Sequence, residues 1–138
     1  MMTTKPAQPF RSGCPIASTL DLVGDKWTLV LIRDMINGKE RFGEFLESPE
    51  RIPTNILANR LRDMERDGLV MREPYSSRPP RFRYRLTASG ESLLPVLQSV
   101  CRWANRQLPE TWTPPASFMR RRPRKPAKDK TRKKRKPT

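Results

Sequence analysis

The sequence predicts a mostly α-helical fold with a small β-hairpin wing, the arrangement called a winged helix-turn-helix. Three observations support this prediction. Several short amphipathic helical segments precede residue 68, the last of them is rich in amide side chains, and two short strand-like segments follow it directly. The residues between these strands are rich in proline and arginine, which is typical of a hairpin tip.

Apolar spacing places the expected helices at residues 15–23, 26–37, 41–47 and about 54–67. Pro15 suits the first turn of the first helix, and Asp25 is a good cap for the second. Gly38 and Gly68 are typical of helix ends, because glycine readily adopts the left-handed conformation that is common there.

The hairpin and a long final helix are expected after residue 68. Residues 69–75 and 81–86 are predicted strands, since residues 81–86 alternate strictly between charged and apolar. Residues 76–80 are expected to form an unpaired tip, because Pro79 and Pro80 lack N–H donors. A helix is predicted at residues 88–108 with a kink at Pro95. It is apolar on most sides, which indicates that a second subunit covers part of it.

Charge divides the 138-residue chain into unequal parts. Residues 120–138 contain twelve Lys or Arg and one acid, so they carry most of the net charge of +15. We expect a disordered arm at residues 1–13, one folded domain at residues 14–108 and a disordered basic tail at residues 109–138. Such a tail favours polyanions without sequence preference, and the alternative is a purely solubilising extension.

Composition also argues against several classes of protein. No apolar run approaches the roughly 20 residues that cross a bilayer, and the N-terminal residues have no signal-peptide core. We therefore expect a cytoplasmic, nucleoid-associated protein with no membrane partner. Histidine is absent, and Cys14 and Cys101 lack the spacing of a zinc site. The sequence indicates no enzyme, no metal and no cofactor, and it does not identify a small-molecule effector.

One face of the helix at residues 54–67 has the side chains that read base edges in a DNA major groove. Leu57, Leu61 and Met64 recur at helical spacing and are expected to face the core. At about 100° per residue, the opposite face carries Thr54, Asn55, Ala58, Asn59 and Arg62. Asn pairs with adenine and Arg with guanine, whereas Thr contacts either type of base. The alternative is an ordinary solvated helix face.

Other basic residues suit contacts with the DNA backbone. Arg78 and Arg81 flank the Pro-Pro tip of the hairpin, whereas Arg83 and Arg85 fit equally well on its solvent face. Arg41 and Thr54 begin the two helices of the helix-turn-helix, where backbone N–H groups favour phosphate. Arg51 lies in the turn between these helices. Two further arginines, Arg60 and Arg66, fit salt bridges to Asp63 or Asp67 at least as well as DNA.

Residues 14–108 contain a series of short motifs, which include the opening Cys-Pro, Gly-Asp-Lys-Trp-Thr, Arg-Phe-Gly-Glu-Phe, Ile-Pro-Thr-Asn-Ile-Leu, Tyr-Arg-Leu-Thr and Leu-Pro-Val-Leu. Through these motifs the segment closely resembles the HxlR family of bacterial and archaeal winged-helix regulators. The resemblance implies a homodimer, joined by its first and last helices, that binds an inverted-repeat operator in double-stranded DNA. Many members have Lys and Thr where this chain has Asn55 and Ala58, so different preferred bases are expected.

Some relatives sense oxidants or electrophiles through a cysteine at the place of Cys14. A thiol just before a helix is chemically suited to this role, because the helix N-terminus favours the thiolate. The alternative is a small residue without redox function, and Cys101 is expected to be a packing residue. We thus predict a sequence-specific transcriptional regulator that responds to redox or electrophile signals if Cys14 acts as a sensor. The alternatives are an architectural, nucleoid-type protein without a specific operator and a module that binds protein or RNA.

Overall fold

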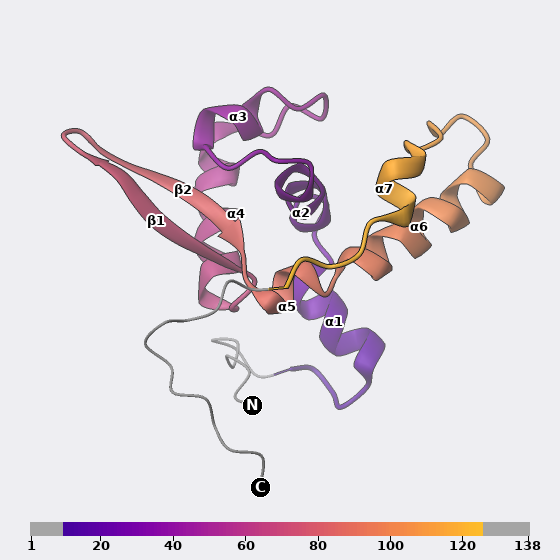
Figure 1. The fold of residues 1–138 in the computed structure, drawn as a ribbon. Coiled ribbons are helices and arrows are strands. Elements are labelled where there is room, and N and C mark those ends of the chain that lie inside the picture. The colour runs from indigo at the N-terminus through magenta and orange to yellow at the C-terminus, as the bar shows by residue number, and fades with distance from the viewer. Residues whose placement is uncertain (1–9, 126–138) are drawn as a thin grey trace, which may run out of the picture.

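A two-stranded antiparallel hairpin projects from a cluster of short helices in the computed structural model, which describes residues 10–125 (Figure 1). The elements in chain order are α1 (Pro15–Val23), α2 (Thr28–Ile36), α3 (Phe42–Leu46), α4 (Thr54–Arg66), β1 (Val70–Ser77), β2 (Pro80–Leu86), α5 (Ala88–Glu91), α6 (Leu94–Gln107) and α7 (Ala116–Arg120). The predicted fold class, mostly α-helical with a β-hairpin wing, is confirmed.

The core forms where α2, α3, α4 and α6 bring their apolar sides together. Its largest fully buried side chains include Phe45, Ile32, Leu57 and Leu94, each 0% exposed. Burying a side chain of this size contributes about 1.5–3 kcal/mol relative to leaving it in water. These contacts therefore fix the angle at which α4 lies against the other helices.

The start of α2 is held by the carboxylate of Asp25. This carboxylate accepts hydrogen bonds from the backbone N–H groups of Trp27 and Thr28 at 2.9 and 3.0 Å, and from the Thr28 hydroxyl at 2.5 Å. Asp25 thus binds the N–H groups at the start of α2, but the residue in the N-cap position is Trp27, and α2 begins at Thr28, two residues later than predicted. The intervening residues form the turn that lets one carboxylate reach both N–H groups.

The wing pairs further toward its tip than the sequence indicated. Ser77 pairs with Pro80, so only Arg78 and Pro79 lie outside the ladder. The expectation of an unpaired tip at residues 76–80 was wrong, because a proline that begins a strand can occupy a position that needs no N–H donor. The register shifts between Pro74 and Ser76, which leaves Tyr75 as the extra residue of a β-bulge.

The predicted helix at residues 88–108 is two helices. Thr87 caps α5 by accepting a hydrogen bond from the Gly90 N–H at 3.1 Å, and α5 ends at Glu91. Pro95 then lies in the first turn of α6, where the missing N–H removes no intrahelical hydrogen bond. The predicted kink is therefore a break, since a proline is tolerated at a helix start and not in its interior.

The expected domain boundaries differ from the structure after residue 108. Residues 109–138 were expected to be disordered, but α7 forms at Ala116–Arg120 and buries Phe118 to 8% exposure. Phe118 and Met119 supply the apolar contact that the basic residues after them lack. Residues 1–9 and 126–138, which comprise most of the expected arm and the last thirteen residues of the expected tail, lie outside the described residues. Between residues 10 and 125 no helix is long and apolar enough to span a bilayer.

Candidate nucleic-acid interface

Helix α4 separates an apolar face from a polar one. Leu57, Leu61 and Met64 are 0%, 2% and 2% exposed, so they anchor the helix in the core. The side chains on the opposite face are exposed, and they are Thr54, Asn55, Asn59 and Arg62. Ala58 lies half-buried between them. The face that the sequence indicated for base contacts is therefore open to solvent and is held by a rigid packed helix.

Two residues of this face contact each other. The Arg62 guanidinium donates a hydrogen bond to the Asn59 side-chain oxygen at 3.3 Å. This long bond keeps both side chains on the outer surface of α4 and is weak enough to exchange for bonds to bases. The pair therefore presents an amide and a guanidinium at adjacent positions.

The arginines on the sides of α4 have a different role. Arg60 contacts Asp63 at 2.7 Å and Asp25, at the start of α2, at 3.9 Å. Arg66 contacts Asp63 at 3.2 Å and Asp67 at 3.0 Å. For these two arginines the salt-bridge alternative is confirmed. Arg60 also joins α4 to the first turn of α2.

The pKa of Asp25 reflects this arrangement. Burial alone would raise the pKa of its carboxyl group. The hydrogen bonds from Thr28 and the Trp27 N–H, together with the charge of Arg60, outweigh burial and hold the pKa below its ordinary value. Asp25 is thus stabilised as the carboxylate, the form that accepts the hydrogen bonds from Trp27 and Thr28.

The N-terminus of α3 is linked to the wing through Arg41. The Arg41 guanidinium carbon lies 4.4 Å from the centre of the Tyr75 ring, and that of Arg83 lies 5.5 Å from it. Two backbone contacts complete this link. Arg41 and Arg83 form an isolated antiparallel β-bridge, and the Tyr84 N–H donates a hydrogen bond to the Glu40 carbonyl at 2.7 Å. The exposed Arg41 therefore sits on an aromatic ring, and a guanidinium placed in this way keeps N–H donors at its edge.

Sequence reasoning missed Tyr75. The bulge at this residue re-aims its side chain toward α3, and nothing in the alternation of the strand indicated a bulge. The neighbouring Pro74 was the one available signal, since proline in a strand favours an irregular position.

The wing presents two classes of arginine. Arg85 contacts Glu73 at 2.9 Å, and Arg72 contacts Glu65 at 3.6 Å and lies 4.3 Å from the Phe82 ring. Arg78 and Arg81 at the tip are exposed, and within residues 10–125 no carboxylate lies within 4.0 Å of either guanidinium. The structure thus leaves the two tip arginines available for an external anion.

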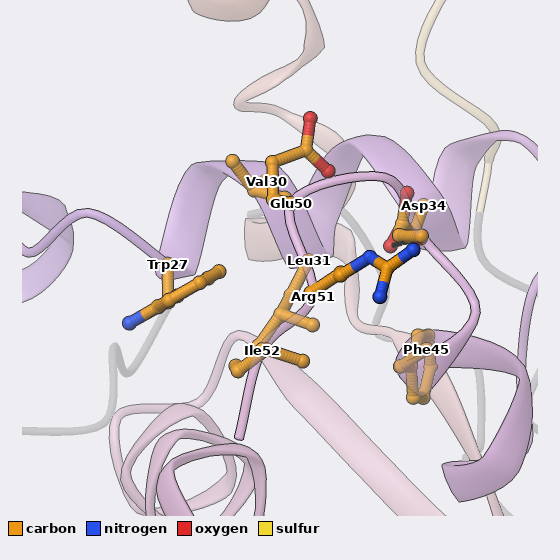
Figure 2. Close-up of a pocket in the computed structure, with 9 residues that line it drawn as sticks. Trp27, Val30, Leu31, Asp34, Phe45, Glu50, Arg51 and Ile52 are labelled. Atoms are coloured by element: carbon orange, nitrogen blue, oxygen red, sulfur yellow. Dashed lines mark hydrogen bonds between the residues drawn. The ribbon is translucent and has the colours of Figure 1, made fainter. Parts of the chain in front are cut away.

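Arg51 lies in the turn between α3 and α4 in a left-handed conformation, with a φ of 56°. The turn passes a hollow beside α2, which Figure 2 shows with Arg51 between Asp34 and Phe45. This hollow has no room for a water molecule, so it is a packing feature and not a ligand pocket. Arg51 is exposed and near the start of α4, but it lies apart from the wing tip.

Cys14 is exposed directly before α1, whereas Cys101 is partly buried in α6. Among residues 10–125 no cluster of three or more metal-ligating side chains occurs. The exposed side chains of α4 and of the wing tip carry amide, hydroxyl and guanidinium groups, which suit the edges of bases and the oxygens of phosphate.

Comparison with known proteins identifies the fold family. A model of the HxlR-like helix-turn-helix matches residues 22–112. The chain belongs to this family. The HTH-type transcriptional regulator YybR of Bacillus subtilis (strain 168) is 39% identical over 114 residues, which cover 81% of this chain and 91% of the relative.

Solved structures agree with this assignment. The redox regulator HypR in its oxidized form is 39% identical, covers 68% of this chain and 97% of its own, and has a TM-score of 0.62. The reduced form of the transcriptional regulator YodB from B. subtilis is 29% identical, covers 73% of this chain and all of its own, and has a TM-score of 0.60. The HxlR-type chain described here is a sequence-specific DNA-binding transcriptional regulator.

Proposed function

We propose that this HxlR-type regulator binds an inverted-repeat operator as a homodimer and acts at the nucleoid in the cytoplasm. The observation that carries the proposal is the exposed polar face of α4, opposite the buried Leu57, Leu61 and Met64. In this proposal α4 enters the major groove and contacts bases through Thr54, Asn55, Asn59 and Arg62. The wing lies along the flanking backbone.

Phosphate contacts fall to the arginines around this helix. Arg78 and Arg81 extend from the wing tip, and Arg41 reaches the backbone while its guanidinium rests against Tyr75. Arg51 adds a contact beside the start of α4. These residues fix the register of the protein on the duplex, whereas the α4 side chains select its sequence.

The homodimer is supported by apolar side chains that the monomer leaves in water. Val96, Val100 and Trp103 recur at i, i+4 and i+7 on α6 and are 41%, 50% and 55% exposed. Ile16 and Leu20 on α1 are 72% and 53% exposed. A second copy that covers both helices removes this apolar surface from water and pairs two copies of α4 by a two-fold axis.

Selection from random duplex DNA tests the proposal directly. The expected result is a palindromic consensus with half-sites about 34–36 Å apart, which is about 10–10.5 base pairs. Tight binding without any consensus would favour the architectural alternative, in which the same fold contacts only the backbone. Competition with duplex DNA at physiological salt would distinguish the regulator and the architectural protein, which both bind duplex DNA, from a module that binds protein or RNA.

A redox response is a second proposal, supported by the exposed thiol of Cys14 and by the 39% identity to HypR, which is named a redox regulator. Modification of this thiol next to α1, one of the two helices of the proposed dimer interface, would alter the relative placement of the two subunits. Repeating the selection with and without oxidant tests this role.

A further inference from the structure

The C-terminal segment returns across the molecule after α6. In Figure 1 it passes from α7 along α6 to α5, near the base of the wing. Phe118 of α7 is 8% exposed, and Met119 packs against the same core. This segment extends beyond residues 22–112, which match the family model. It therefore lies outside the part of the chain that the family model describes.

A buried amide fixes the end of α7. The Gln98 side chain is 8% exposed, and its amide nitrogen donates hydrogen bonds to the carbonyls of Phe118 at 3.0 Å and Arg121 at 2.8 Å. Carbonyls at a helix end lack intrahelical partners, and an unsatisfied buried amide costs about 1–3 kcal/mol. The Gln98 amide N–H groups and the two carbonyls pair with one another, so the path of the chain beyond α7 is defined.

Two more contacts guide the chain toward the wing. The Arg121 guanidinium donates to the carbonyl of Ile36 at the end of α2, where the helix dipole favours a cation. The backbone N–H of Arg124 donates to the Glu91 carboxylate at 2.8 Å. Glu91 ends α5, which begins two residues after β2 ends. Arg124 therefore lies beside the base of the wing.

The side chains on this path are basic and exposed, namely Arg120, Arg122, Arg124 and Lys125. Within residues 10–125, no carboxylate lies within 4.0 Å of their charged groups. Four exposed cations on an anchored backbone form a surface suited to closely spaced phosphates, the pattern of a nucleic-acid backbone.

We propose that residues 120–125 form a second phosphate-contact surface, which holds the duplex outside the half-site contacted by α4. The inference rests on the proposed DNA-binding function and adds a separate contact to it. Because backbone phosphates carry no direct sequence information, this surface increases affinity and leaves base preference unchanged. The Gln98 and Phe118 contacts act as positioning elements for it.

Salt dependence of DNA binding tests the charges. The triple variant Arg120→Gln/Arg122→Gln/Lys125→Gln should flatten the plot of log K against log salt by about 0.9 for each lost contact, or roughly 3 per subunit at most. Lys26→Gln/Arg102→Gln/Arg106→Gln removes the same charge from exposed positions elsewhere and should change the slope little. Equal slopes in the two variants would overturn the proposal. A duplex trimmed to the selected half-sites should abolish the difference between them.

A chemical nuclease tests the position. An iron chelate attached to Arg122→Cys, in a Cys14→Ser/Cys101→Ser background, should cut the backbone at a few nucleotides just outside each half-site. Adding Phe118→Ser and Gln98→Ala should spread these cuts, with circular dichroism confirming that the domain stays folded. If the protein that keeps Phe118 and Gln98 gives no cuts, or cuts spread evenly along the duplex, the proposal is overturned. The salt test does not depend on the variant without these anchors. The side chains that the salt test substitutes are exposed, so their replacement leaves the core intact.

The two proposals fail in different ways. If Asn59→Ala changes the preferred bases but the basic triple variant keeps the slope of the parent, only the second surface is wrong. If selection yields no consensus at all, the proposed operator binding itself is wrong.

Discussion

Asn59 lies within the exposed face of α4, four residues after Asn55 and three before Arg62. An asparagine amide can pair with adenine through one donor and one acceptor, and such a pair contributes about 1–3 kcal/mol of discrimination. The value of this residue lies in its exposure, since the same amide buried in the core would need partners from the protein.

The first prediction concerns this amide. Asn59→Ala should weaken binding to the selected operator by about 1–3 kcal/mol and relax the preference at one base position per half-site. Titration against operators with single base changes measures both effects. Asn37→Ala, which removes an exposed amide at the end of α2, is the control and should leave the preference intact. An unaltered base preference in Asn59→Ala would show that this face does not read bases.

The second prediction concerns the exposed thiol. In Cys14→Ser, diamide or a quinone should no longer release DNA, because the reactive sulfur is gone, while affinity without oxidant should stay unchanged. Cys101→Ser is the matched control, since that thiol is partly buried. Gel-shift titrations with and without oxidant measure the difference. If both variants still release DNA on oxidation, Cys14 is not the sensor.

At the scale of elements, the wing separates arginines that stabilise it from arginines that extend beyond it. Arg85 is paired with Glu73, whereas Arg78 and Arg81 remain free at the tip within the described residues. Tyr75 connects this wing to α3 through its contacts with Arg41 and Arg83. The wing is therefore held against the start of α3 partway along its length and is charged at its end.

The third prediction follows from this division. Arg78→Gln/Arg81→Gln should weaken binding to all sequences alike and lower the salt slope by about 0.9 per lost contact, or about 2 per subunit. Arg85→Gln should change the slope less, because its charge is already offset by Glu73. Fluorescence anisotropy over a range of salt concentrations on operator and random duplexes tests this. A loss restricted to the operator would instead indicate base contacts by the wing.

The fourth prediction concerns the start of α2. The pKa of Asp25 is lowered in the folded state, so its contribution to the free energy of unfolding is present above the unfolded-state pKa of about 3.9 and is lost as pH falls through the folded value. Asp25→Asn should remove this part of the acid sensitivity and should also lower stability at neutral pH, where the carboxylate is the better acceptor.

Denaturant unfolding at pH 7 and near pH 3 measures both effects. Asp25→Ala should cost about 0.5–2 kcal/mol at neutral pH, the range for a lost helix cap. The free energy of unfolding should change less between pH 7 and pH 3 in Asp25→Asn than in the parent. An identical change in both proteins would contradict the role assigned to the carboxylate.

At the scale of the whole molecule, the exposed apolar faces of α1 and α6 suit the proposed assembly of two copies. The fifth prediction is that Val100→Glu/Trp103→Glu converts the proposed dimer into monomers, since it would bury two charges in an apolar contact. Operator affinity should fall steeply in this variant, because each subunit then binds its half-site independently. Sedimentation equilibrium measures the mass. Arg102→Glu, about 120° round the helix from Val96, should leave the dimer intact.

Much of the fold and part of the candidate site followed from periodicity. Helical spacing separates the apolar and polar faces of α4 whatever it packs against, because the period of 3.6 residues fixes which side chains share a face. In β2, strict alternation of charged and apolar residues separated the two faces of the strand, because successive side chains point to opposite faces. Local signals were weaker at prolines: Pro80 and Pro95 both end up at the start of an element, where the missing N–H has no consequence.

The sequence by itself determined which face of α4 is polar, where the wing lies and how the charge is distributed, because these depend on residues close together in the chain. Only the tertiary structure decided that Arg85 pairs with Glu73, that Tyr75 bulges toward Arg41, and that Gln98 holds the carbonyls of Phe118 and Arg121. Each of these contacts joins residues far apart in sequence, and their pairing depends on how the packed core places the elements in space.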